Sequence, residues 1–253
     1  MAVGGSTSSR SDRSVKLPSS PLRNPVHAAR TYNVERSTPA IPSIFFPDRP
    51  LANDFVSDET FDQLLHAWFG NLSRVLAPGR GFYIWGGYAN LGNYPPALKD
   101  CGLYFSQGIV WDKQHPVLTR KDFMGCFEIC FYGWKQGAAH VFLGPNNAPD
   151  LWHVKKINPM QMEHLTAKPA ELAVRAMQFS SRLGENVLDL FGGSGSTLIA
   201  AEQTGRKAFL MELDPLYCDV IADRFQRFTG KSAVLERTGE SPLPMKPQEV
   251  NMR

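Results

Sequence analysis

Apolar side chains recur along the middle of the chain with two alternating periods. Between residues 58 and 76 they are spaced three and four residues apart, which predicts an amphipathic helix that ends at Pro78-Gly79. The short apolar run 81–85 follows this stop and predicts a buried strand. The alternation continues down the chain and indicates an α/β domain, with a mostly parallel sheet covered by helices on both faces.

The same patterns predict the elements between residues 97 and 235. Helices are expected at 97–101, 171–179, 196–203 and 215–228, and strands at 103–111, 128–135, 186–190, 207–213 and 233–235. The runs 103–111 and 128–135 are rich in β-branched and aromatic residues, and a polar stretch separates them. They therefore predict an antiparallel hairpin at an edge of the sheet.

Both ends of the chain lack a hydrophobic period. Residues 1–40 are rich in Ser and Pro and carry six basic side chains against two acidic ones, so we expect residues 1–44 to form a disordered basic tail. An Arg- and Ser-rich leader is also typical of an organellar transit peptide, but no amphipathic helix carries these arginines. Residues 236–253 are expected to be a second disordered tail, which leaves 45–235 as the folded domain.

The composition narrows the class of protein. Of 253 residues, 43% are hydrophobic and the formal net charge is only +3, which fits a soluble globular chain and excludes a collagen-like or coiled-coil one. No apolar stretch approaches the roughly 20 residues of a membrane-spanning helix. Four scattered cysteines are too few for a disulfide framework and favour a reducing cytoplasm.

The strongest chemical signal is a glycine-rich turn at 191–196, between an expected strand and an expected helix. Glycines there let backbone N–H groups approach a ligand closely. A P-loop would need a lysine after Gly195, and a dinucleotide fingerprint would need a third glycine where Leu198 stands, so both are disfavoured. S-adenosyl-L-methionine remains, and Glu212 at the end of the next strand can accept hydrogen bonds from its ribose. The alternative is a turn that merely packs tightly.

Several segments resemble the DNA amino-methyltransferases that modify adenine N6 or cytosine N4. Asp-Leu-Phe-Gly-Gly-Ser-Gly-Ser-Thr at 189–197 and Met-Glu-Leu-Asp-Pro-Leu-Tyr-Cys at 211–218 resemble the cofactor motifs of that family. Residues 164–169, 109–113 and 131–135 are also similar to family segments. The resemblance covers about 48–233 and implies a Rossmann-like methyltransferase fold that uses S-adenosyl-L-methionine.

The order of these segments indicates one subgroup. Only 41 residues follow Glu212, so the other strands of the sheet must precede the glycine turn. Most small-molecule methyltransferases have the opposite order, which disfavours that class. The resemblance is therefore to the permuted β-type order, with a target-recognition region at 114–163 and a cofactor half at 164–235.

The resemblance also implies a site and a setting. The implied cofactor-binding residues are Thr166, Lys168, Asp189, Phe191, Gly192, Gly193, Ser194, Gly195, Ser196 and Glu212. Double-stranded DNA with a flipped target base is the implied partner, with no metal and no membrane. A cytoplasmic restriction-modification system of bacterial or phage type is the expected setting.

One motif of the family is missing. It is a tetrapeptide, Asp/Asn/Ser-Pro-Pro-aromatic, that holds the target amine and stacks on the flipped base. Its place would be ahead of Asp48, yet residues 1–47 contain no such sequence, and Asn93-Tyr-Pro-Pro96 has the wrong order and opens a helix. The catalytic residues therefore stay unassigned, and the family's sheet is expected to lose the strand that carries the motif. The alternative to an active enzyme is a cofactor- and DNA-binding remnant.

Basic and aromatic side chains are interleaved around the expected hairpin. Lys113, Arg120 and Lys121 are predicted to contact DNA phosphates beside Trp111, Phe123 and Trp134. An ordinary solvated hairpin is the alternative. Cys126 and Cys130 have no matching Cys or His pair, so no zinc site is expected.

Overall fold

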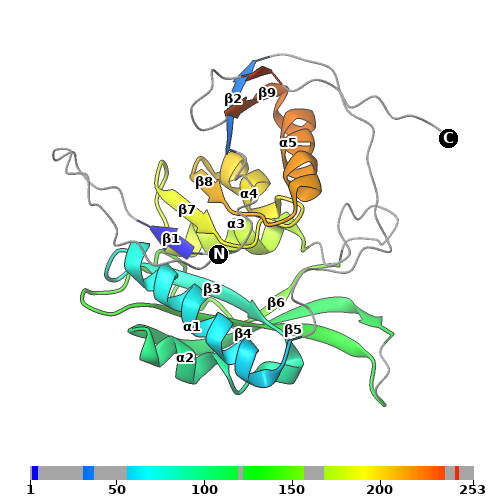
Figure 1. Ribbon diagram of the computed structural model, residues 1–253. Coiled ribbons are helices and arrows are strands. Elements are labelled where there is room, and N and C mark those ends of the chain that lie inside the picture. Colours follow the sequence, from blue (N-terminus) through cyan, green and yellow to red (C-terminus); the bar gives the residue numbers. More distant parts are fainter. Residues whose placement is uncertain are drawn as a thin grey trace.

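A computed structural model describes residues 56–118, 122–156 and 168–236, together with the backbone of three short strands at 2–4, 31–36 and 243–244. Its centre is a seven-stranded sheet with the order β6-β4-β5-β3-β1-β7-β8 (Figure 1). These strands are β1 (Ala2–Gly4), β3 (Gly81–Gly86), β4 (Leu103–Val117), β5 (Gly125–Lys135), β6 (Leu151–His153), β7 (Asn186–Asp189) and β8 (Lys207–Leu210).

The α/β fold class is confirmed, but the sheet is mixed rather than mostly parallel. Only β4 with β6 and β7 with β8 pair in parallel, and the other neighbours are antiparallel. The predicted β4–β5 hairpin forms, although β6 lies outside it at the edge of the sheet. Both hairpin strands are longer than predicted, because the ladder continues through the polar residues after Trp111, with an irregularity between Asp112 and Val117.

Helices cover both faces of this sheet. They are α1 (Asp58–Val75), α2 (Tyr94–Asp100), α3 (Ala170–Ser180), α4 (Ser196–Thr204) and α5 (Pro215–Thr229), with the short 3₁₀ helix η1 at Tyr88–Asn90. Phe82 and Phe131 face the apolar stripes of α1 and α2, while Tyr83 and Tyr132, one position along each strand, face α3. This alternation follows from the two-residue period of strand side chains.

A second, three-stranded sheet lies beside α5 at the top of Figure 1. It contains β2 (Thr31–Arg36), β9 (Lys231–Glu236) and β10 (Leu243–Pro244), with β2 antiparallel to β9 over six residue pairs. Strands β1, β2 and β10 lie in the segments expected to be disordered. Sequence patterns did not predict these strands, because main-chain pairing between distant segments leaves no local hydrophobic period.

The sheet has two parts that meet at β1. Strands β3–β6 form one part and β7–β8 the other, and the three-residue β1 pairs with β3 through Ala2 and with β7 through Ala2, Val3 and Gly4. Contacts around α3 reinforce this junction. The guanidinium of Arg80 at the start of β3 donates to both carboxylate oxygens of Glu185 at 2.8 and 3.1 Å, and the Tyr83 and Ser180 hydroxyls are 2.7 Å apart.

Within the described ranges, none of the helices combines the length and the apolar character needed to cross a lipid bilayer.

Candidate functional site

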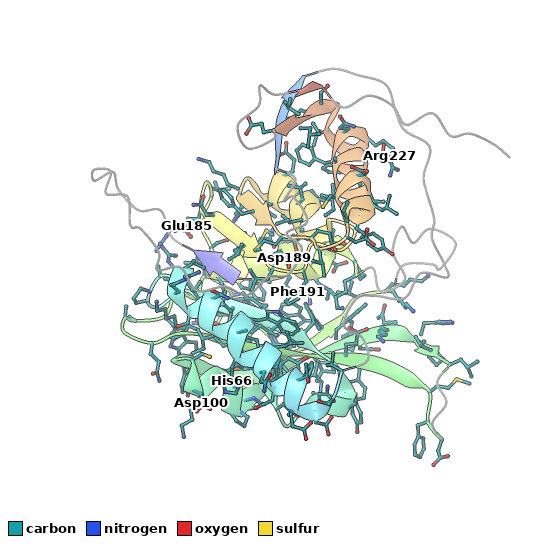
Figure 2. The ribbon with its side chains drawn as sticks, in the orientation of Figure 1. His66, Asp100, Glu185, Asp189, Phe191 and Arg227 are labelled. Carbon is teal, nitrogen blue, oxygen red and sulfur yellow. The ribbon has the colours of Figure 1, made fainter. Side chains whose placement is uncertain are left out.

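The glycine turn lies at the edge of the sheet where several strands end. Strands β3 and β7 are both antiparallel to β1, so they run in the same direction, and β4 shares that direction because β5 separates it from β3. The carboxyl ends of β3, β4, β7 and β8 therefore meet at one edge. Ligands of open α/β sheets bind at this edge. Figure 2 shows Asp189 and Phe191 there, between the part with α1 and α2 and the part with α4 and α5.

Asp189, the last residue of β7, shapes the turn. One carboxylate oxygen accepts a hydrogen bond from the backbone N–H of Phe191 at 3.1 Å, and the other accepts from the Thr197 hydroxyl at 2.5 Å. The Gly192 N–H donates to the carbonyl of Met211, next to β8, at 2.8 Å. The turn is thereby fixed at both of its ends.

The glycines are required by close packing and by backbone conformation. Gly193 and Gly195 have φ values of +53° and +80°, which side chains disfavour. A Cβ at Gly192 would lie 3.1 Å from Ile221 of α5 and 3.3 Å from the Met211 carbonyl, and one at Gly195 would lie 3.1 Å from Ile221. The turn therefore packs closely against α5 and the end of β8, and forms a tight cradle ahead of α4 that a side chain at Gly192 or Gly195 would disturb.

Glu212 closes the cradle from the loop after β8, because that strand ends at Leu210 and not at the predicted residue 213. Its Oε2 accepts from the Gly193 N–H at 2.7 Å, and its Oε1 accepts from the Asp214 N–H at 3.0 Å. Each carboxylate oxygen has a second lone pair for another donor. The sequence placed Glu212 beside the turn through strand order alone, and the structure brings the two together.

Lys168 and Ser196 join the site through a side-chain-to-backbone contact. The Ser196 hydroxyl donates to the Lys168 carbonyl at 2.7 Å. Arg224 of α5 donates to the Ser194 carbonyl at 2.9 Å and to its hydroxyl at 3.1 Å. The role of Arg224 was not predicted, because its position in an amphipathic helix does not show what it faces. Thr166, also predicted, lies outside the described residues.

Phe191 stands beside the turn with 59% of its surface exposed. Its ring meets Trp68 of α1 edge-on, with centroids 4.9 Å apart. The sequence predicted Trp68 only as part of an apolar stripe. An aromatic wall of this kind suits an apolar or heteroaromatic ligand face.

Of the three residues predicted to contact DNA, the structure describes one. Arg120 and Lys121 lie outside the described residues. The Lys113 side chain is 11% exposed, and its ammonium lies 3.0 Å from Glu128 of β5, a geometry that favours a structural role over a phosphate contact. Trp111 is buried and donates its indole N–H to the Val154 carbonyl at 2.7 Å. Phe123 and Met124 are exposed near the hairpin tip.

Glu128 is shared with a second lysine, because its Oε2 is 3.3 Å from Lys168 Nζ. Burial alone would raise the pKa of Glu128, but the neighbouring Lys168 and Lys113 outweigh burial and lower the pKa below its ordinary value. The carboxylate is therefore ionised at neutral pH. The sequence showed Glu128 only as the start of a strand.

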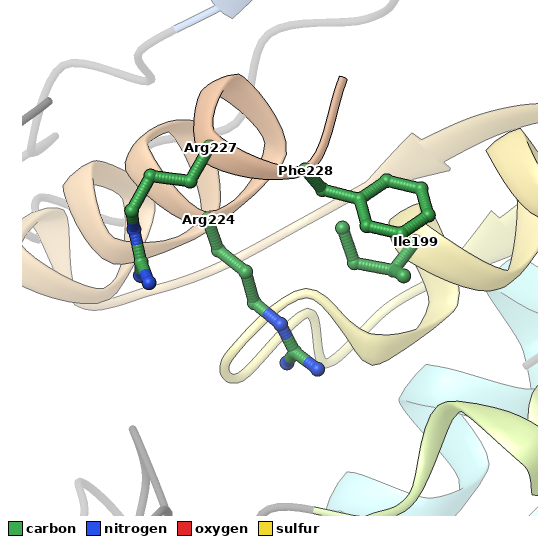
Figure 3. Close-up of a pocket in the computed structure, with 4 residues that line it drawn as sticks. All are labelled: Ile199, Arg224, Arg227 and Phe228. Carbon is green, nitrogen blue, oxygen red and sulfur yellow. The ribbon is translucent and has the colours of Figure 1, made fainter. Parts of the chain in front are cut away.

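Two other features lie away from the turn. Cys126 is exposed and Cys130 is buried, and burial raises the pKa of Cys130 to about 12. A cavity of about 290 Å³ opens between α4 and α5, lined by Ile199, Arg224, Arg227 and Phe228 (Figure 3). Because Arg224 also contacts Ser194, this cavity adjoins the outer side of the turn.

The chain is similar in sequence to known DNA methylases. A family model described as DNA methylase, of the N6 and N4 type, matches residues 24–223. The type II methyltransferase M.XycI of Xanthomonas campestris pv. cyanopsidis is 30% identical over 142 residues, which are 51% of this chain and 47% of that protein. The type II methyltransferase M.HpaI of Haemophilus parainfluenzae is 23% identical over 217 residues, 77% of this chain and 69% of that protein. The chain thus spans about half the length of the first relative.

The fold is also similar to solved structures. The crystal structure of the M1.HpyAVI–SAM complex aligns with a TM-score of 0.60 and 23% identity, over 67% of this chain and 85% of that one. This likeness confirms the Rossmann-like methyltransferase fold that the sequence predicted.

Proposed function

Because the chain belongs to the N6/N4 family of DNA methylases, we propose that it binds S-adenosyl-L-methionine in the glycine turn and transfers the methyl group to an exocyclic amine of adenine or cytosine in DNA. The observation that carries the proposal is the hydrogen bond between Glu212 and the Gly193 N–H, which joins the ends of β7 and β8 into one cradle. Adenosine-type ligands bind where a glycine turn and an acidic residue on the next strand meet.

The residues at the turn fit this cofactor. Gly192 and Gly195 let the turn pack closely on Ile221 of α5, whereas a Cβ at Gly193 would meet only the Phe191 carbonyl, at 3.9 Å, so a ligand would approach the backbone at Gly193. Glu212 would hold the ribose hydroxyls through its remaining lone pairs, and the exposed Phe191 would cover an apolar part of the ligand. Lys168, fixed to Ser196 through its carbonyl, would lie at the other end of the cofactor.

When bound, S-adenosyl-L-methionine supplies a methyl group on a positively charged sulfur that a nitrogen lone pair can attack in line. The chain's own task is then to hold the acceptor amine against it and to exclude water. The β4–β5 hairpin extends beyond the carboxyl edge of the sheet, so it is suited to contact DNA there, with the target base flipped out of the duplex. A cytoplasmic restriction-modification role stays a prediction.

A second candidate is a cofactor- and DNA-binding protein with little or no methyl transfer. The observation that favours it is β1, because the position between β3 and β7 is held by Ala2-Val3-Gly4, which runs antiparallel to both neighbours. The family resemblance assigns the acceptor tetrapeptide to a strand of this sheet, and the full sequence contains no Asp/Asn/Ser-Pro-Pro-aromatic motif.

Two measurements on the full chain test these proposals. Calorimetric titration with S-adenosyl-L-methionine tests the cofactor, and an absence of binding would exclude both candidates. Transfer of tritiated methyl groups to DNA of mixed sequence then separates them. Loss of the acceptor loop is expected to slow transfer by about a thousandfold or more. Turnover at ordinary enzyme rates would contradict the second candidate. Asn93 would then be the first residue to substitute, because Tyr94 is buried and stacks on Phe131 with ring centroids 4.6 Å apart.

A further inference from the structure

One carboxylate ties together three segments that are distant in sequence. Glu128 of β5 pairs in register with Trp111 of β4, and Lys113, two residues further along β4, lies on the same face of the sheet. Lys113 Nζ is 3.0 Å from one oxygen of Glu128, and Lys168 Nζ is 3.3 Å from the other. The strand pair is therefore linked through Glu128 to the residue that precedes Pro169 and α3.

The three charges depend on one another. Lys113 is 11% exposed at its side chain, and Glu128 and Lys168 are each about one-third exposed. The two lysines keep the pKa of Glu128 low, so it stays charged near neutral pH. Removing its charge would leave two ammonium groups facing each other in a partly buried position, where repulsion is less screened than in water.

The link continues from Lys168 into the glycine turn. The Lys168 carbonyl accepts from the Ser196 hydroxyl at 2.7 Å, and Ser196 is the first residue of α4. Arg224 fixes the preceding Ser194 from the other side, through its carbonyl at 2.9 Å. The backbone of Lys168 is thus held by the turn while its side chain is held by β5.

These contacts cross the junction at β1 between the two parts of the sheet. Among the described residues, the two parts of the sheet share ladder hydrogen bonds only through the three residues of β1, and β3 pairs with β1 at Phe82 alone. Glu128 lies close to the carboxyl end of β3, since its neighbour Ile129 pairs with Gly86. The ion pair therefore bridges the two parts at the edge that carries the turn.

We propose that Glu128 is a positioning residue, which fixes the glycine turn relative to the β4–β5 hairpin by holding Lys168. The effect of Glu128 on ligand binding rests on the proposed function, because the ligand there is the proposed cofactor. The mechanical link itself belongs to the free protein and can be measured without any ligand.

Hydrogen–deuterium exchange of the free, full-length protein tests the link. In Glu128→Gln the amides of 190–198 are expected to exchange about tenfold faster, because the turn opens more often. Lys168→Met should give the same increase and leave the Glu128–Lys113 pair intact, so it serves if Glu128→Gln folds poorly. The double variant should exchange no faster than the faster single variant, since both changes break one path.

Glu171→Gln is the matched control. It makes the same chemical change in an exposed carboxylate whose ion-pair partner, Arg175, lies one turn away in the same helix α3, at 3.2 Å. Exchange at 190–198 that is unchanged in Glu128→Gln, or that rises equally in Glu171→Gln, would overturn the proposal.

Calorimetric titration with S-adenosyl-L-methionine separates this inference from the proposed function. If wild type binds, Glu128→Gln is expected to bind about five- to tenfold more weakly, while Glu171→Gln binds as wild type does. If wild type shows no binding, the proposed function fails, and the exchange measurement alone decides the role of Glu128. If wild type binds but exchange at 190–198 is unchanged in Glu128→Gln, the inference is overturned and the proposed function stands.

Discussion

Glu212 is proposed both to stabilise the glycine turn and to bind the cofactor. Its carboxylate holds the Gly193 and Asp214 N–H groups in the free protein, and its remaining lone pairs are proposed to hold the ribose of the cofactor. Charged acceptors make stronger hydrogen bonds than neutral ones, so the charge matters as well as the shape. Substitution of Glu212 should therefore change the stability of the free protein and its affinity for the cofactor to different degrees.

Replacing Glu212 by alanine is expected to weaken S-adenosyl-L-methionine binding by about 2 to 4 kcal/mol, because two hydrogen bonds to a charged acceptor are lost. Titration calorimetry on wild type and Glu212→Ala measures this change. Glu202→Ala is the control, since Glu202 is a partly exposed residue of α4 that pairs with Lys231 at 2.6 Å. Equal affinities in wild type and Glu212→Ala would remove Glu212 from the binding site.

A single methyl group tests the turn itself. Gly195→Ala is expected to destabilise the protein by about 1 to 2 kcal/mol, because alanine disfavours the left-handed conformation. Contact of the new Cβ with Ile221, at 3.1 Å, should add to this cost. Urea unfolding gives the change in the free energy of unfolding.

The control for this substitution is Gly102→Ala. Gly102 has a similar φ of +71° but open space around its Cβ position, so it reports the conformational cost alone. An equal loss of stability in both variants would show that α5 yields to the methyl group, and that the cradle is looser than its packing indicates.

At the scale of elements, the junction between β3 and β7 depends on a buried ion pair. The side chains of Arg80 and Glu185 are 15% and 10% exposed, and Glu185 also accepts from the Arg182 N–H at 2.9 Å. Removing one partner of a buried pair leaves the other charge without compensation. This cost usually exceeds the net contribution of the pair.

Glu185→Ala is therefore expected to lower the free energy of unfolding by about 3 to 5 kcal/mol. Arg80→Met with Glu185→Leu should cost less than Glu185→Ala alone, because no charge is left unpaired. Urea unfolding of the three proteins measures both effects. A loss below about 1 kcal/mol in Glu185→Ala would indicate a pair that behaves as an exposed one.

The elements also show which parts of the fold a sequence can predict. Helix α1 and the β7–turn–α4 unit were predicted because their signals are local: a helical period, a glycine pair and a strand directly before them. Strand β6, with only three residues, and β1, Ala-Val-Gly, carry no such period and are defined by what they pair with. Glu212 was predicted at the site because it follows the glycine turn by one helix and one strand in the sequence. Glu128 and Arg224 were not predicted there, because only the packing of distant elements brings them to the site.

At the scale of the whole molecule, the proposed function raises the question of which basic groups would hold DNA. Lys113 is ion-paired with Glu128, so Arg120 and Lys121 are the remaining residues predicted to contact phosphates. The basic side chains of residues 1–40 are the alternative carriers of these contacts. Deleting residues 1–40 would also remove β1 and β2 from their sheets. Substitution is therefore the sharper experiment.

Arg120→Ala with Lys121→Ala is expected to lower the slope of log affinity against log salt by about 2, as two released counterions would. Lys113→Met should leave the slope unchanged. A triple variant, Arg10→Gln, Arg13→Gln and Arg23→Gln, tests the amino-terminal tail. Fluorescence anisotropy of a labelled duplex over a salt series gives the slopes. A fall only in the tail variant would move the DNA contact from the hairpin to the tail.

The position of β1 has a practical consequence for expressing the protein. Ala2 pairs with Leu188, and Gly4 with Asn186, so the chain enters the sheet from the edge where Asp189 begins the glycine turn. An affinity tag or fluorescent fusion attached ahead of Ala2 would leave the molecule through that edge, beside the cofactor cradle. We expect such a fusion to crowd the glycine turn and to weaken ligand binding there.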